Sequence, residues 1–329
     1  MRRNPSRFVR LLHLVLAIAC TCWLAGAPAR ASAAPRPALI DLTDDFDAFW
    51  ERTQGLEAGA RVQAFYAEMN RLLPGFFSAS RVGVEQPRYD RHIADALAAY
   101  PDQREGIREV SRRFAALFEP ARISFERSFG PLRMARPILL IHSLGEMDGG
   151  TRSLPGGTML IFGADVIARL HLAHDIRPFF HHELFHVYHF THFTTCDEIW
   201  CSLWAEGLAT YVAQRLNPRA TDAELLLEVP SPIRAAVEAN KTEAVCTVLA
   251  RLDSTEPTDS DALFSFRRMN ERLPPRFGYY VGYLVAAELG RQRSLRVLAR
   301  MQSGELRPLI ERALRTLASC TPTRTPSRS

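Results

Sequence analysis

Histidine is concentrated in one short stretch of this 329-residue chain. Seven of its ten histidines lie between His171 and His192, and the stretch contains His182-Glu183-Leu184-Phe185-His186. On an α-helix, residues four positions apart project from the same face, so both imidazoles of this motif can reach one metal ion. Glu183 lies about 100° around the helix from His182, where its carboxylate can act as a general base without being a ligand. The pattern therefore predicts a zinc site on a helix.

A third ligand can come from either of two positions. Glu206 follows His186 by 20 residues, in Leu203-Trp204-Ala205-Glu206-Gly207-Leu208-Ala209-Thr210-Tyr211, which leaves room for a loop and a second antiparallel helix. His192 completes the spacing HExxHxxGxxH, but His189 stands where a glycine normally turns the chain through a positive φ. That second pattern also needs a downstream methionine turn, and the first methionine after the cluster, Met269, is in no such context. The motifs favour Glu206 and leave His192 as the alternative.

An HExxH helix followed by a helical glutamate at this interval resembles the gluzincin metallopeptidases. The local form Trp204-x-Glu206-Gly207-x-Ala209-x-Tyr211 looks like a group of predicted exported zinc-dependent proteases within that clan. The resemblance covers roughly residues 137–290 and implies that His182, His186 and Glu206 bind one Zn²⁺ while Glu183 is the base. Many gluzincins carry an acidic residue four positions after the ligand glutamate, which orients a ligand histidine. This chain has Thr210 there, so that support must come from another group or through the threonine hydroxyl.

A tyrosine-rich segment could supply a hydrogen-bond donor for the oxyanion that forms during hydrolysis. It reads Pro274-Pro275-Arg276-Phe277-Gly278-Tyr279-Tyr280-Val281-Gly282-Tyr283. Gly278 is expected to open a helix on which Tyr279 and Tyr283 share one face. A similar stretch in related predicted proteases favours Tyr279 as the donor, with Tyr283 as the alternative. Simple packing of these aromatic rings is the competing interpretation.

Helical patterns surround the histidine cluster. Residues 34–136 have apolar residues at i, i+3 and i+4, with Pro87 and Pro101 expected to interrupt the helices. Residues 137–217 contain two short apolar strands, Ile138–Ile141 and Met159–Phe162, joined by a glycine-rich connection, and then the two helices of the metal site. Residues 218–319 are expected to form a helical lobe, and residues 320–329 a disordered tail.

Together with the resemblance, these patterns predict an α+β, mainly helical fold of the zincin-like metallopeptidase type. A small mixed β-sheet and the active-site helix would lie between helical N- and C-terminal parts. If the strand Met159–Phe162 is a sheet edge beside the site, it could hold an extended peptide by backbone pairing.

The first 33 residues have the pattern of a secretory signal peptide. Arg2, Arg3, Arg7 and Arg10 precede a short apolar run, and Ala31-Ser32-Ala33 is a small-x-small cleavage site. A membrane anchor is less favoured, because the run is shorter and more polar than a span of about 20 apolar residues. The chain is therefore expected to be exported, to the periplasm or the extracellular space, without stable membrane association after cleavage near Ala33.

Cleavage would also change the charge and the cysteine content. The segment holds five of the 41 lysines and arginines and no acidic residue, so the chain that remains after cleavage would have 36 basic and 36 acidic side chains. This parity gives no reason to expect a nucleic-acid partner. Cys196, Cys201, Cys246 and Cys320 would remain in an oxidising compartment, and we expect Cys196 to pair with Cys201 and Cys246 with Cys320.

These features predict an exported zinc-dependent metallopeptidase acting on peptide or protein substrates. An endopeptidase is favoured, because no signature for binding a free amine is evident. The alternatives are a non-catalytic periplasmic zinc-binding protein and an inactive zincin-fold interaction protein. Glu183 separates them, since only a hydrolase needs a base beside the metal.

Overall fold

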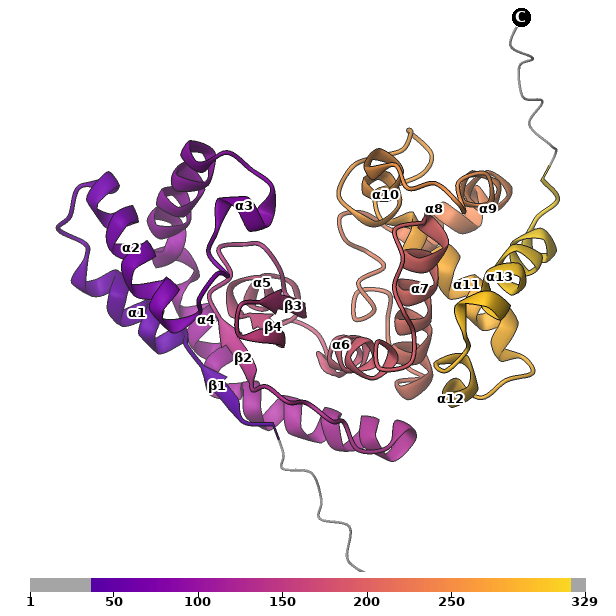
Figure 1. The fold of residues 1–329 in the computed structure, drawn as a ribbon, viewed down its shortest axis with the longest axis horizontal. Helices are drawn as coiled ribbons and strands as arrows, with labels where there is room; N and C mark the ends of the chain where they lie inside the picture. Colours follow the sequence, from indigo (N-terminus) through magenta and orange to yellow (C-terminus); the bar gives the residue numbers. More distant parts are fainter. Residues whose placement is uncertain (1–36, 321–329) are drawn as a thin grey trace, which may run out of the picture. The chain divides into compact units, whose positions relative to one another are not determined.

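Helices make up most of the structure, with one small sheet among them (Figure 1). The computed structural model describes residues 37–320, so the predicted signal peptide and all but the first residue of the predicted tail lie outside the described residues. The strands are β1 (Leu39–Asp41), β2 (Ile138–Ile141), β3 (Gly149–Leu154) and β4 (Gly157–Gly163). The helices are α1 (Thr43–Arg52), α2 (Ala58–Leu72), α3 (Ala79–Val82), α4 (Gln86–Phe129), α5 (Ala164–Leu170), α6 (Arg177–His189), α7 (Ile199–Leu216), α8 (Ile233–Ala239), α9 (Lys241–Leu249), α10 (Pro257–Phe264), α11 (Phe277–Gly290), α12 (Leu295–Leu298) and α13 (Ser303–Leu317). The predicted α+β, mainly helical class with a small mixed sheet is confirmed.

The four strands lie in the order β1-β2-β4-β3. Strand β2 pairs in parallel with β1 and β4, whereas β3 pairs antiparallel with β4. Every residue of β2 is buried, as expected for a central strand that is covered on both faces. Part of that cover is α4, since the rings of Phe114 and Phe118 contact Phe162 of β4 at centroid distances of 5.1 and 5.5 Å.

The structure corrects the prediction for the strands. Met159–Phe162 lies inside β4, which has a partner on each side, so it is not a sheet edge. The edge is β3, within the segment predicted to be only a glycine-rich connection. The sequence does not predict this strand because it begins with Gly149 and Gly150, and glycine has no side chain to contribute to the alternating pattern typical of a β-strand. The short strand β1 also lies within a region expected to be wholly helical.

The structure also corrects the expected break at Pro101, because α4 continues through both Pro101 and Pro120. A proline removes one backbone hydrogen bond, so a helix interior usually disfavours it. Both prolines are on the solvent side of α4, where water can hydrogen-bond to the freed carbonyl groups. Tyr100 and Ile107, on either side of Pro101, are buried, and we infer that this packing holds the helix together.

The helix predicted to carry the metal ligands, α6, packs against α4, α7 and the edge strand β3. Its own aromatic residues secure this position. Phe180 contacts Phe114 and Phe118 of α4 at centroid distances of 5.4 and 5.2 Å, and all three rings are buried. The packing fixes the side of α6 that faces β3 and α7.

Helices α7 and α11 lie side by side and cross in backbone contact at two glycines (Figure 1). A Cβ added at Gly207 would lie 2.1 Å from the carbonyl carbon of Gly282, and one added at Gly282 would lie 2.3 Å from the carbonyl oxygen of Leu203. Gly207 directly follows Glu206, and Gly282 lies one turn after Tyr279. The crossing therefore sets the spacing between two predicted site residues.

Gly207→Ala is expected to lower the free energy of unfolding by about 1–3 kcal/mol or more, because the added methyl group overlaps fixed backbone atoms. Chemical denaturation measures the effect. The matched control is Gly59→Ala in α2, where an added Cβ meets nothing within 4 Å, and which should be neutral or slightly stabilising. Equal stabilities of the two variants would contradict a tight crossing.

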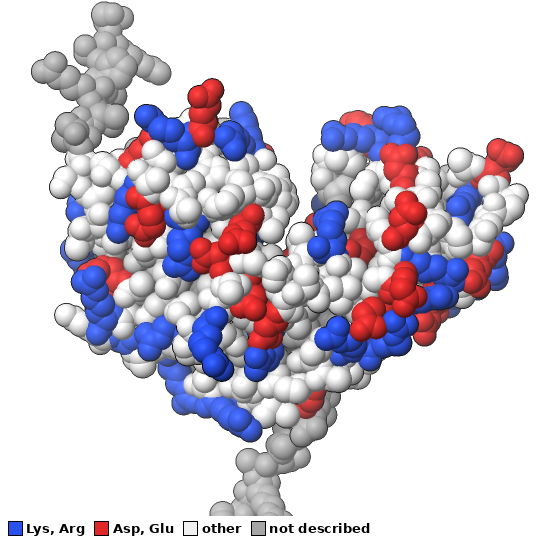
Figure 2. Space-filling view, turned by 180° about the vertical axis from the view of Figure 1, so that it is seen from behind, with Lys and Arg blue, Asp and Glu red and all other residues white. Residues whose placement is uncertain are grey.

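The cysteines pair as predicted. Cys196 bonds to Cys201 and Cys246 to Cys320, with Cα–Cα distances of 5.7 and 5.5 Å. The first bridge lies just after α6 and at the start of α7, and the second ties α9 to the end of the described chain. On the surface, acidic and basic side chains are interspersed over the face shown in Figure 2. Among residues 37–320, no helix combines the length and the apolar character needed to cross a bilayer.

Candidate metal centre

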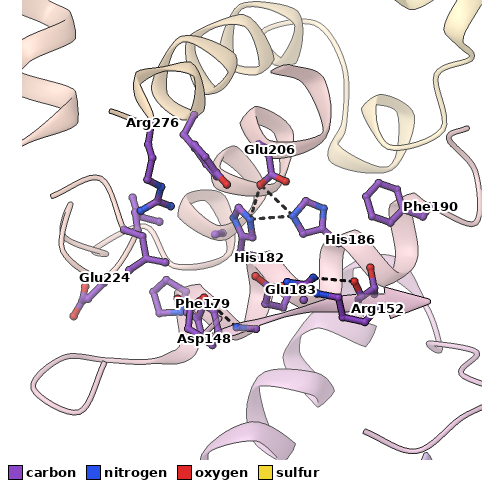
Figure 3. Close-up of a pocket in the computed structure, with 18 residues that line it drawn as sticks. Asp148, Arg152, Phe179, His182, Glu183, His186, Phe190, Glu206, Glu224 and Arg276 are labelled. Carbon is purple, nitrogen blue, oxygen red and sulfur yellow. Dashed lines mark hydrogen bonds and ion pairs between the residues drawn. The ribbon is translucent and has the colours of Figure 1, made fainter. Parts of the chain in front are cut away.

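Helix α6 presents His182, Glu183 and His186 on the side that faces a cavity of about 280 Å³. Pro178 lies in the first turn, where a proline costs no helical hydrogen bond. Phe180, Leu184 and Phe185 are buried and do not line the cavity. The HExxH segment is therefore helical, as predicted, and both imidazoles project in one direction (Figure 3).

Helix α7 brings Glu206 to these imidazoles. Glu206 Oε2 lies 3.2 Å from His182 Nε2 and 3.3 Å from His186 Nε2, and the two Nε2 atoms are 3.0 Å apart. Three potential ligand atoms thus form a triangle with nearly equal sides (Figure 3). The sequence predicted this set of residues, and the structure brings all three together.

The triangle has the dimensions of one face of a zinc coordination tetrahedron. Zinc binds imidazole nitrogen and carboxylate oxygen at about 2.0–2.2 Å, so the ligand atoms of a tetrahedral site lie about 3.3 Å from each other. The observed sides of 3.0, 3.2 and 3.3 Å agree with that spacing. Two histidines and one glutamate leave a fourth position open, as in catalytic rather than structural zinc sites. The donor set therefore fits one zinc ion.

The electrostatics of the triangle also suit a cation. Burial opposes the charge on Glu206, but His186 and His182 hold the pKa of its carboxyl below its usual range. Burial lowers the pKa of His182, although Glu206 opposes this shift. At neutral pH the carboxylate is therefore ionised and the His182 imidazole neutral, which are the protonation states that metal ligands require. The pKa of His186 is raised instead, because the charges of Glu206 and Glu183 outweigh its burial, and binding of a cation would displace that proton.

Glu183 lies beside the triangle and is not part of it. Burial raises the pKa of its carboxyl to about 8, with the charges of Asp148 and Glu206 adding to the effect and His186 opposing it. A nearby divalent cation would favour the ionised form and lower that pKa. A base whose pKa can be set near neutrality is suited to accept a proton from water.

Gly149 lets the edge strand β3 approach Glu183 closely. A Cβ at this position would lie 2.7 Å from the Phe179 ring and 3.0 Å from Cγ of Glu183. The preceding residue, Asp148, lines the same cavity, and one of its carboxylate oxygens lies 3.0 Å from His171 Nε2. The His171 ring stacks on Phe179. Sequence analysis did not find the Asp148–His171 pair, because the two residues are 23 positions apart and form no motif.

Other side chains that line the cavity can contact a bound substrate, and they include two arginines, two aromatic residues and a carboxylate. Arg152 and Phe190 lie on the His186 side, and Arg276 and Glu224 on the His182 side (Figure 3). Tyr279, predicted as the oxyanion donor, lines the cavity, and its ring is 6.5 Å from that of His182. Neither arginine was singled out from the sequence, since a lone arginine carries no spacing signal.

The alternative ligand His192 is not part of the triangle and does not line the cavity. It follows α6 and contacts the ring of Tyr188. His189 is buried against Phe185 and Phe193. A second group of potential ligands, Cys196, Glu198 and Cys201, has both sulfur atoms in a disulfide, which removes the thiolates that would bind zinc.

Thr210 does not replace the acidic residue that supports a ligand histidine in many gluzincins. Its hydroxyl donates to the backbone carbonyl of Glu206 at 2.9 Å. Among the described residues, none accepts a hydrogen bond from Nδ1 of His186. The threonine therefore stabilises the local turn of α7 rather than the orientation of an imidazole.

Comparison with protein-family models, with curated proteins and with solved structures finds no match to this chain.

Proposed function

We propose that this chain is an exported zinc-dependent metallopeptidase of the gluzincin type, with a zincin-like core. The observation that carries the proposal is the triangle of His182, His186 and Glu206 with Glu183 beside it. A storage or structural zinc site would need the triangle but not a buried carboxylate next to it. The signal-like N-terminus and the two disulfides support export.

The proposed reaction is hydrolysis of a peptide bond. A bound Zn²⁺ would lower the pKa of water to about 7 and polarise the substrate carbonyl. Glu183 accepts the proton of the attacking water and delivers it to the leaving amine. Its burial beside β3 keeps bulk water from competing for that proton. His182, His186 and Glu206 would hold the ion and would not exchange protons with the substrate.

Strand β3 is the proposed binding site for the backbone of the substrate. It is the edge of the sheet, its other neighbour is α6, and its first four residues line the cavity. An extended peptide can add to such an edge through main-chain hydrogen bonds. The sequence suggests this role for Met159–Phe162 only if that segment is the sheet edge, and the edge is β3 instead.

Tyr279 is the proposed donor to the oxyanion. Burial raises the pKa of its hydroxyl, and the charge of Glu206 adds to the shift, so the group stays protonated and able to donate at working pH. Tyr283 packs against Tyr211 and Tyr280 instead and is not among the residues that line the cavity.

Tyr279→Phe is expected to lower kcat by about 10²–10³-fold with little change in KM, because the lost hydrogen bond forms mainly in the transition state. Steady-state kinetics on a fluorogenic peptide measures the two constants. Tyr283→Phe is the matched control and should keep kcat close to that of the wild type. If the two variants behaved alike, the assignment of the donor would be wrong.

Removal of the metal tests the proposed function as a whole. The mature chain should cleave an unfolded protein substrate, lose this activity when zinc is chelated, and regain it with one equivalent of Zn²⁺ but not with Mg²⁺, which prefers all-oxygen sites. Mass spectrometry of the products identifies the bonds cleaved. Cleavage that persists at full rate after complete removal of zinc would refute the proposal.

A further inference from the structure

Arg276 occupies a position that a non-glycine residue rarely adopts. It directly precedes α11 and has φ 64° and ψ 13°, which is the left-handed region. For an L-residue this conformation is less favourable by roughly 1 kcal/mol or more. Glycine or asparagine would fit with less strain. The arginine side chain is therefore the feature of interest, and it lines the same cavity as the metal triangle (Figure 3).

The guanidinium of Arg276 is held in place by one hydrogen bond and two rings. Nη1 donates to the carbonyl of Val229 at 3.1 Å, and the guanidinium carbon lies 4.6 Å from the ring centre of Tyr279 and 5.9 Å from that of Phe266. Arginine has five N–H donors, so this arrangement orients the planar group and leaves donors available. The stacking on Tyr279 connects the guanidinium to the proposed oxyanion donor.

No carboxylate among residues 37–320 forms an ion pair with Arg276. The other arginine of the cavity, Arg152, pairs with Glu146, which also binds Arg81. Glu224 lines the cavity near Arg276, but its carboxylate oxygens accept the backbone N–H groups of Asp175 and Thr221. Asp148 is likewise engaged, by His171 and by its neighbouring backbone N–H. Arg276 is thus an oriented, half-buried cation that forms no ion pair with a carboxylate of residues 37–320, although its charge, after that of His171, helps to lower the pKa of the Asp148 carboxyl.

An oriented guanidinium with free donors in a partly buried site is suited to bind a carboxylate in bidentate geometry. We propose that Arg276 is a specificity residue that binds a carboxylate of the substrate, on the His182 side of the scissile bond. This inference rests on the proposed peptidase function and specifies its substrate class: peptides with an acidic group at one fixed distance from the bond that is cleaved. The carboxylate belongs either to an Asp or Glu side chain or to the free C-terminus.

Matched peptides test the inference in the wild-type, zinc-loaded protein. One set replaces each residue near the scissile bond in turn by Glu or by Gln, and a second set compares a free C-terminal carboxylate with its amide. We expect one position at which the carboxylate raises kcat/KM by about 10–100-fold over its neutral counterpart, the range of a charge-assisted hydrogen bond. A preference in the first set identifies a side chain, and one in the second set identifies the C-terminus.

Arg276→Gln should reduce this ratio to near one, because a neutral side chain loses the advantage that the guanidinium gives to the carboxylate member of each pair. A purely structural role, through Val229 or Tyr279, would instead slow both members of every pair alike. Arg152→Gln is the matched control, because Arg152 already has an acidic partner, and it should keep the preference. A preference that survives in Arg276→Gln, or none in the wild type, overturns the inference.

Measuring peptide binding without hydrolysis tests the role of Arg276 independently of the proposed peptidase function. The same peptides are titrated by fluorescence anisotropy into zinc-loaded Glu183→Gln protein, with Arg276 either intact or replaced by Gln. Selective binding of the carboxylate peptide that depends on Arg276 supports the inference even if the wild type hydrolyses no peptide, in which case only the peptidase proposal fails. Equal binding of acidic and neutral peptides, or no binding, overturns the role of Arg276.

Discussion

Replacing Glu183 by glutamine is expected to lower kcat by about 10²–10⁴-fold while one zinc ion remains bound. Glutamine has nearly the same shape as glutamate, so it can occupy the buried space between α6 and β3 without moving the ligands. It cannot accept the proton of the attacking water. Activity and metal content are therefore expected to separate in this variant.

Both quantities are measured on the same preparation, by peptide hydrolysis and by elemental analysis. Glu224→Gln is the matched control, because Glu224 lines the same cavity but accepts hydrogen bonds from backbone groups of the neighbouring loop. It should keep kcat near the wild-type value. Full peptidase activity in Glu183→Gln would exclude the proposed base, and a zinc-binding protein without catalysis would show no activity in either form.

Removal of any one ligand of the triangle is expected to weaken zinc binding by well over 10²-fold, since the loss of an outer hydrogen-bonding partner alone costs about 10–100-fold. His182→Ala, His186→Ala and Glu206→Ala should each lose the metal on dialysis. His192→Ala should retain it, because His192 lies outside the triangle. Calorimetric titration of the metal-free proteins with Zn²⁺ measures the affinities.

The comparison of zinc affinity among the four variants identifies the third ligand. Retention of zinc by Glu206→Ala together with its loss from His192→Ala would favour the HExxHxxGxxH spacing over the triangle. Circular dichroism shows whether each variant is folded. The Glu206 side chain is only partly buried and faces the cavity, so its removal should leave the helices of the core in place.

Sequence analysis could predict the parts of the site that depend on local spacing. Two imidazoles four residues apart on a helix must share a face, and the interval from His186 to Glu206 suits a return by a second helix. The two disulfides were also predictable, since four cysteines allow only three pairings. In each case a short-range rule of chain geometry limits the possible arrangements.

The parts of the fold and of the site that could not be predicted depend on contacts between segments that lie far apart along the chain. The edge strand β3 contains glycines that show no β pattern, so neither its existence nor its place next to Glu183 could be inferred. Pro101 was expected to end a helix, but its exposed position lets α4 continue. Arg276 forms no ion pair because the nearby carboxylates of Glu224 and Asp148 bind other groups, and these contacts leave no spacing pattern in the sequence.

X-ray absorption at the zinc edge, on the mature protein loaded with one equivalent of Zn²⁺, tests the central claim most directly. The structure predicts a four-coordinate ion with two imidazole ligands and otherwise oxygen ligands at about 2.0–2.1 Å. Glu206→Ala should abolish that signal. Sulfur ligands at about 2.3 Å, or a third imidazole in place of the carboxylate, would contradict the proposed centre.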